Sequence, residues 1–493
     1  MNQPSILYGL FLLCIAVLYW AIPGKRAKLW VMLLGSIVFY ALLPTAQYVP
    51  LLLVMVTINY AIGRVLGTPL DWRIPNEAWQ YAQDDWNRRR SRVLWLGILL
   101  NVLLLLSFKY WVPVLRMLGY SAVVETAAPE WPMPWGLSFF TFECIAYLVD
   151  VYRGSPACDR FLEFSAYKLS FPKLLSGPIT RYHSFAAQFK TLAFPSLSQN
   201  VEGLWLIASG AIKKLILADN IGRLVDLSAG NLPRAGSGDI WLLAFAYGLQ
   251  LYLDFSGYVD VARGSALLLG FNLPQNFDFP YFTTSIASFW RRWHITLGDW
   301  LRNYLYFPLG GSRRGLTRTC INLMVVMLVA GVWHGDRWGF IVWGAIHGLA
   351  LIIHRLTAAV SEKSNLFVGF WTSLPGVILA WALTQLTVFF SWIFFRLPNL
   401  NDASLAIRHL FGHSADIQFA QKVYYESFYN LSRAQIAVSL AGIVALMGVS
   451  YAVQRDLKLQ LSWPIKVFLL PVCCFLAWVF APSEAATYIY FDF

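Results

Sequence analysis

The chain has 493 residues, of which 58% are hydrophobic and only 13% are charged. A soluble globular chain is about 45–50% apolar and about 25% charged, so this composition excludes a soluble protein and predicts a polytopic membrane protein. We assign the net charge of +12 to basic loops on the cytoplasmic leaflet and not to nucleic-acid binding, because the sequence contains no basic soluble domain.

The N-terminal part of the chain is predicted to cross the membrane four times. Apolar segments of spanning length lie at 6–22, 29–46, 48–66 and 93–111. The short connection 24–28 is basic, and so is the end of the polar stretch 67–92, which places both in the cytoplasm and the N-terminus outside. The loop 117–134 contains two Glu and no Lys or Arg, which fits the outer side.

The pattern changes after residue 135. Residues 153–190 mix basic side chains with aromatic residues and with Pro172 and Pro178, which predicts short interfacial or re-entrant elements on the cytoplasmic side. Irregular backbone at membrane depth is tolerated only where it lines a cavity or is covered by protein. Two further apolar segments follow at 201–218 and 239–253.

Three ionisable residues, Asp254, Asp260 and Arg263, interrupt the apolar region that follows. Ionisable residues inside a membrane are candidates for function. A structural ion pair lining a polar cavity explains them equally well, since Asp260 and Arg263 are spaced i, i+3.

The C-terminal part returns to plain membrane segments, at 338–357, 367–397, 435–454 and 464–482. The basic loop from Arg455 to Lys466 is predicted to be cytoplasmic, which places the aromatic tail 481–493 outside. Both termini are then extracytoplasmic, and the number of full crossings is even. We predict ten crossings and a single membrane domain over residues 1–493.

His334 is the first candidate for catalysis. It ends an apolar run and lies between Gly331 and Gly335, which would let a ligand approach the backbone closely. A neutral imidazole at this place could act as a general base on an attacking hydroxyl. The alternative is a structural histidine at the end of a helix near the interface.

His294 is the second candidate and follows a basic, aromatic segment. Arg291, Arg292 and Trp293 could grip the phosphates and the adenine of a nucleotide-like donor. The alternative is an interfacial helix anchored at the lipid headgroups. His347 and His354 share one helix face, but no second histidine pair is present for a haem.

Taken together, five stretches resemble the membrane-bound O-acyltransferase (MBOAT) superfamily. They are SFFTFECIAYLVDVYRG (138–154), FPKLLSGPITRY (171–182), LDFSGYVDVARGSALLLGFNLPQNFDFPY (253–281), SFWRRWHITLGDWLRNYLYFPLGG (288–311) and GVWHG (331–335). The resemblance covers about residues 135–350 and is greatest to the branch of bacterial polysaccharide O-acetyltransferases similar to the alginate acetylation protein.

This resemblance implies a fold and a site. The fold would be all-α, with a ring of about ten or more transmembrane helices around short re-entrant or buried helices. His334 would be the catalytic histidine and His294 the second histidine of the active site. Acetyl-CoA would be the donor substrate, reached from the cytoplasm through a funnel in the bacterial inner membrane, and no metal is expected.

The last residues, Tyr488 to Phe493, resemble an aromatic C-terminal motif of this branch. The resemblance implies that Tyr490 approaches the catalytic histidine and carries the acyl group onward. Tyr488 and Asp492 stand where relatives more often have Phe and Gln. A short aromatic anchor at the outer interface is the alternative.

We therefore expect a membrane O-acetyltransferase for an exported, alginate-like or other polysaccharide. The final transfer would need an extracytoplasmic acetyltransferase partner, because the chain has no outer soluble domain with a serine hydrolase-type site. D-alanyl transfer to a cell-envelope polymer is one alternative. A non-enzymatic transporter of the polymer or its lipid-linked precursor is another, since broken helices and intramembrane charges suit both.

Overall fold

The computed structural model describes residues 6–70, 76–120, 132–363, 365–425, 430–482 and 486–491. Within these residues the regular structure is helical, and no strand is present. Seven of the described helices are long and apolar enough to cross a membrane. The chain is therefore a multi-pass, all-α membrane protein, as its composition predicts.

Six of the seven candidate spans lie where apolar segments were predicted, and the seventh, Leu316–His334, ends in the candidate histidine. Four predicted crossings are not among the seven. The two near the N-terminus form helices shorter than 18 residues. The segment 201–218 continues from an α-helix into a π-helix and contains three charged residues, and the one at 239–253 lies in a longer helix that carries several charges. A helix of 16 residues extends only about 24 Å, against a hydrocarbon core of about 30 Å.

The described chain divides into two compact units that alternate along the sequence. The first contains Met1–Ile207, Tyr258–Pro274 and Tyr490–Phe493, and the second contains Ala208–Gly257 and Gln275–Ile489. The single membrane domain stays a prediction, as does the catalytic core at 135–350. His294 and His334 both belong to the second unit, whereas Tyr490 belongs to the first.

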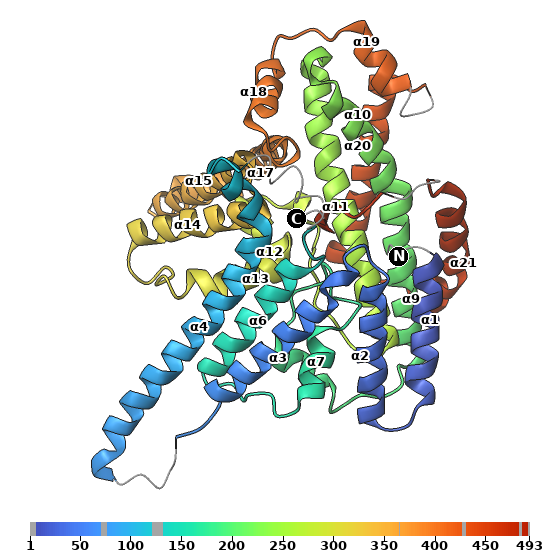
Figure 1. Ribbon diagram of the computed structural model, residues 1–493. Coiled ribbons are helices and arrows are strands. Elements are labelled where there is room, and N and C mark those ends of the chain that lie inside the picture. The colour runs from blue at the N-terminus through green and yellow to red at the C-terminus, as the bar shows by residue number, and fades with distance from the viewer. Residues whose placement is uncertain are drawn as a thin grey trace. The chain divides into compact units, whose positions relative to one another are not determined.

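The first unit contains helices α1 to α8 and most of α9, whose last turn belongs to the second unit. Their bounds are α1 (Ile6–Ala21), α2 (Lys25–Ala41), α3 (Val49–Leu66), α4 (Asn76–Met117), α6 (Leu137–Tyr152), α7 (Phe161–Lys168), α8 (Tyr182–Gln188) and α9 (Leu197–Ala211). Helices α3, α4 and α6 run side by side (Figure 1). The short helices α7 and α8, with an irregular segment between them, agree with the short elements predicted for residues 153–190.

Helix α4 begins far earlier than its apolar part. The second half of the polar stretch 67–92 is helical and forms the first part of α4. Hydropathy detects contact with lipid and not helicity, which explains the difference. Arg90 stabilises this extension, because its guanidinium donates to the carbonyls of Leu66, Val151 and Tyr152, which end α3 and α6.

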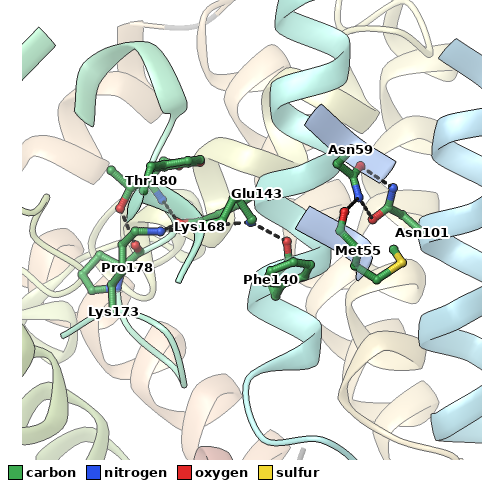
Figure 2. Close-up of polar contacts among 10 residues, drawn as sticks. Met55, Asn59, Asn101, Phe140, Glu143, Lys168, Lys173, Pro178 and Thr180 are labelled. Carbon is green, nitrogen blue, oxygen red and sulfur yellow. Dashed lines mark hydrogen bonds and ion pairs between the residues drawn. The ribbon is translucent and has the colours of Figure 1, made fainter. Parts of the chain in front are cut away.

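A reciprocal amide pair joins α3 to α4. Asn101 donates to the Asn59 Oδ1 at 2.8 Å, and both side chains are fully buried (Figure 2). Each amide also donates to the carbonyl one helical turn earlier, on Met55 and Gly97. Between helices in a membrane, such polar contacts add directional attraction to van der Waals packing.

Glu143 on α6 holds the irregular segment between α7 and α8. Its carboxylate lies 3.2 Å from the Lys168 Nζ and 2.6 Å from the Lys173 Nζ, and it accepts a hydrogen bond from the Thr180 backbone N–H (Figure 2). Burial lowers the pKa of Lys173 to about 8, although Glu143 acts to raise it. One carboxylate therefore binds the end of α7, through Lys168, and two points of the irregular segment that follows it.

The second unit contains most of the membrane spans. Its helices are α10 (Asp219–Gly230), α12 (Ile286–Arg292), α13 (Ile295–Leu301), α14 (Leu316–His334), α15 (Trp338–Ser361), α16 (Asn365–Thr372), α17 (Leu374–Arg396), α18 (Leu400–His409), α19 (Ile417–Ala420), α20 (Arg433–Tyr451) and α21 (Trp463–Phe480). Helix α11 (Ser237–Leu268) begins in this unit and ends in the first. Helices α14 and α15 lie side by side, and α15 also packs on α17 (Figure 1).

We predict that Glu143→Gln destabilises the protein by about 3–5 kcal/mol, because the amide leaves two buried ammonium groups without their counter-charge. Thermal unfolding in detergent measures this change. The control is Glu163→Gln, which breaks partly exposed pairs with Lys25 and Arg160 and is expected to lower stability by less than about 1 kcal/mol. Equal effects of both substitutions would contradict the role of Glu143.

Candidate active site

His334 is the last residue of α14 and is 3% exposed. The prediction that its glycine neighbours let a ligand approach the backbone is wrong. A Cβ added at Gly331 would lie 2.4 Å from the Phe340 carbonyl oxygen, and one at Gly335 would lie 2.5 Å from the Phe340 ring. The two glycines therefore let α15 pack directly against the end of α14.

Aromatic rings surround the imidazole of His334. Ring centroids lie 4.8 Å away for Phe395 on α17, 5.0 Å for Trp343 on α15 and 6.3 Å for Phe340. The neighbouring Trp333 ring lies at 4.5 Å. Rings from three helices thus shield this histidine from bulk water, which strengthens electrostatic interactions at its nitrogens.

His294 occupies a strained backbone position between α12 and α13. Its φ of 42° lies in the left-handed region, which is uncommon for a residue with a Cβ. Asn276, fully buried, holds the chain just beyond it: its carbonyl oxygen accepts from the Ile295 N–H, and its Oδ1 accepts from the Thr296 N–H and hydroxyl. Such strain persists where the surroundings fix it and is frequent at functional sites.

The two candidate histidines share one neighbour. The Trp333 ring lies 4.5 Å from that of His334 and 6.4 Å from that of His294, and His294 also contacts Phe255 at 4.9 Å. Burial lowers the pKa of His294 to about 3, so its ring is neutral at physiological pH. The fold thus gathers two buried imidazoles, from two separate motifs, around one indole.

The three candidate donor-binding residues have different surroundings. Arg291 is exposed and donates to the Ser288 Oγ at 2.8 Å. Arg292 is half-buried, and its Nη1 has no hydrogen-bond partner among the described residues. Trp293 is only 2% exposed and packs against Phe277 and Trp392, so its indole belongs to the core of the second unit.

His347 forms a hydrogen-bonded chain of its own. Its Nδ1 accepts from the Trp290 indole N–H at 3.3 Å, so its Nε2 donates to the Ser391 Oγ at 2.9 Å. Ser391 in turn donates to the Val388 carbonyl. These contacts assign His347 to the structure of the second unit, where it links α12, α15 and α17.

Tyr490 lies in the first unit and is 3% exposed. The Ser176 Oγ donates to its carbonyl oxygen at 3.4 Å, and the Ser176 N–H donates to the Tyr258 hydroxyl. Phe491 packs on Trp135 and Tyr258. The approach of Tyr490 to His334 stays a prediction, since the two residues belong to different units, and Asp492 lies outside the described residues.

Comparison with known proteins identifies the family. Residues 159–391 match MBOAT, the membrane-bound O-acyltransferase family. The probable alginate O-acetylase AlgI of Pseudomonas syringae pv. tomato is 34% identical over 87% of this chain and 76% of its own length. The peptidoglycan O-acetyltransferase of Helicobacter pylori is 33% identical over 78% of this chain and 74% of its own length. The chain belongs to the MBOAT family.

A third relative is similar over a shorter part of the chain. The teichoic acid D-alanyltransferase of Streptococcus thermophilus is 28% identical over 44% of this chain and 56% of its own length. The family match and the first two relatives identify the chain as a membrane-bound O-acyltransferase. The matched region contains His294 and His334 and stops before the tail with Tyr490.

The sequence analysis did not identify two residues of this MBOAT protein that the structure shows to hold other parts of the chain. Asn276 lies in a Pro- and Asn-rich break, where one more Asn carries no signal, although it holds the turn that presents His294. Lys214 lies in the predicted apolar span 201–218 and pairs with Asp219 and Asp254. A lysine inside an otherwise apolar run was the available signal for that site.

We predict that Gly331→Ala lowers acyl transfer and destabilises the protein by about 1–3 kcal/mol, because its Cβ forces α15 away from His334. Activity in membranes and thermal unfolding measure the two effects. Gly442→Ala in α20 is the matched control, since a Cβ there meets no atom within 4 Å. If Gly331→Ala behaves like this control, the close packing of α14 on α15 does not position the site.

Proposed function

We propose that this MBOAT enzyme moves acetyl groups from cytoplasmic acetyl-CoA across the bacterial inner membrane, for O-acetylation of an exported polysaccharide. The observation that carries the proposal is the breadth of its similarity to curated O-acetylating relatives, which reaches 87% of the chain at 34% identity. The D-alanyltransferases match only 44% of it. Acetyl is therefore favoured over D-alanyl as the group transferred.

In the proposed reaction His334 acts as general base. The hydroxyl of Tyr490 attacks the thioester carbonyl of acetyl-CoA, so that a C–O bond forms and the C–S bond breaks. His334 takes the phenolic proton and returns it to the departing sulfur, which leaves as free CoA. Neutral His294 lies beside the Trp333 that contacts His334, where it could hydrogen-bond the thioester oxygen.

Donor binding is assigned to the basic segment before His294. Arg291 is exposed, and Arg292 carries a buried Nη1 with no partner among the described residues, so both could pair with phosphate oxygens of CoA. Trp293 is proposed to act from the core, by fixing the position of these arginines.

The acetyl group then leaves the membrane enzyme. The acetyl ester of Tyr490 would pass to an extracytoplasmic acetyltransferase partner, and Tyr490 would regain its proton. The polysaccharide, alginate or another glycan, would be an indirect acceptor held by that partner. The basic loops at 24–28 and 455–466 support this direction, since basic loops favour the cytoplasmic side and so predict both termini outside.

Replacement of His334 by Ala is predicted to abolish release of CoA from acetyl-CoA in inside-out membrane vesicles, because no base remains to accept the proton. His413→Ala is the control: this exposed histidine contacts none of the rings around His334 and should leave the rate unchanged. Wild-type vesicles that bind acetyl-CoA but never release CoA would favour a transporter. CoA release by His334→Ala at the wild-type rate would sink the assignment of the base.

The substitution Tyr490→Phe is predicted to lower polymer acetylation by about 100-fold or more, since the ring remains but the acetyl-accepting hydroxyl is lost. The acetyl content of the exported polymer measures this. Tyr425→Phe, at an exposed tyrosine in the second unit, serves as control for loss of one phenol. An unchanged acetyl content in Tyr490→Phe would mean that the tail is only an anchor.

A further inference from the structure

A buried ionic cluster lies in the second unit and shares no residue with the rings that surround His334. The Lys214 Nζ contacts the Asp219 Oδ1 and the Asp254 Oδ1, each at 2.7 Å. The side chains of all three residues are at most 5% exposed. Two carboxylates thus face one ammonium group in an apolar interior, an arrangement that is stable only if further donors reach the carboxylates.

A π-helix creates this cluster. The segment η3 (Ile212–Ala218) links α9 to α10, and the Asp219 N–H donates to the Lys214 carbonyl, five residues back. In an α-helix, side chains five residues apart point to different faces, whereas this wider turn aligns them. Isolated π-turns within helices are frequently found at functional sites.

The C-terminal tail completes the cluster. Lys214 donates to the Thr487 carbonyl at 3.1 Å, and the Ile489 N–H donates to the Asp254 Oδ2 at 3.0 Å. The Tyr488 ring lies 4.6 Å from the Lys214 Nζ, within reach of a cation–π interaction. An ammonium group has three N–H donors, and the two aspartates and Thr487 use all three.

These contacts bind the tail to the buried cluster. Without residues 487–489, the ammonium of Lys214 and the carboxylate of Asp254, whose side chains are each only 2% exposed, would each lose one hydrogen bond. Burial acts to lower the pKa of Lys214, but Asp254 and Asp219 raise it above its ordinary value, so the lysine stays charged. A charged, buried group holds its partners tightly.

We propose that Lys214 and Asp254 are positioning residues that keep residues 487–489 anchored throughout turnover, so that Tyr490, the next residue, acts from a fixed place and not as a swinging arm. The proposal rests on the function proposed above, in which Tyr490 carries the acetyl group. It gives Lys214 and Asp254 a role, although neither takes part in the reaction proposed for His334.

Hydrogen–deuterium exchange on the purified full chain in lipid nanodiscs tests the anchor itself. Ile489→Pro removes one N–H donor without burying a new charge, at the first position of a 3-10 helix that proline tolerates. Exchange of the remaining tail amides should rise by about tenfold or more in this variant. Ile489→Val keeps the N–H and should retain wild-type protection.

Asp254→Asn tests the cluster from its other side. The amide has one acceptor end, so its NH₂ group must face either Lys214 or the Ile489 N–H, both of which are donors. Tail exchange should rise in this variant too. Rapid exchange of the tail in the wild-type protein, or unchanged exchange in both Ile489→Pro and Asp254→Asn, would overturn the anchor.

Kinetics separate positioning from folding. In Ile489→Pro and Asp254→Asn, acetyl transfer to the acceptor should fall by about tenfold or more, while the KM for acetyl-CoA stays at its wild-type value. Full transfer with a released tail would overturn the positioning role. Full transfer by Tyr490→Phe would instead overturn the tyrosine relay, and the exchange measurement would still decide whether the anchor exists.

Discussion

A charge inside an apolar interior is stable only where the chain supplies its partners, and two lysine–carboxylate clusters meet this requirement here. In the first unit Glu143 joins Lys168, Lys173 and the Thr180 N–H, which fixes the irregular segment between α7 and α8. That segment carries Ser176, which binds the Tyr490 carbonyl. In the second unit the Lys214 cluster holds the residues just before Tyr490. In each unit the buried charged groups therefore hold irregular backbone in place.

In the candidate site, aromatic rings and close helix packing position the histidines, and not ion pairs. Gly331 and Gly335 bring α15 against the end of α14, and this contact sets Trp343 and Phe340 around His334. Asn276 fixes the strained turn of His294. The two candidate catalytic histidines are thus positioned by residues that take no part in the proposed reaction. Such supporting residues keep the geometry of a site fixed.

Reasoning from the sequence predicted the membrane class and most of the long spans correctly, because hydropathy is a local signal. Short motifs also pointed to the two histidines, whose catalytic roles stay predictions. It did not find what depends on distant partners. Arg90 lies in a run of basic residues that resembles any cytoplasmic loop, yet it binds the ends of two helices. Trp293 lies in a basic, aromatic segment typical of ligand binding, but its side chain is buried in the core of the second unit. Lys214 meets Asp219 only because a π-helix shifts the register, and no periodicity predicts that.

The central claim is that acetyl passes from acetyl-CoA through the site of His334 to the tail. Mass spectrometry of the C-terminal peptide, after brief incubation of the nanodisc-embedded enzyme with acetyl-CoA and without acceptor, tests it most directly. We predict the added mass of one acetyl group, located at Tyr490, in the wild-type protein and none in His334→Ala. Release of CoA with an unmodified tail, or an acetylated tail in His334→Ala, would contradict it.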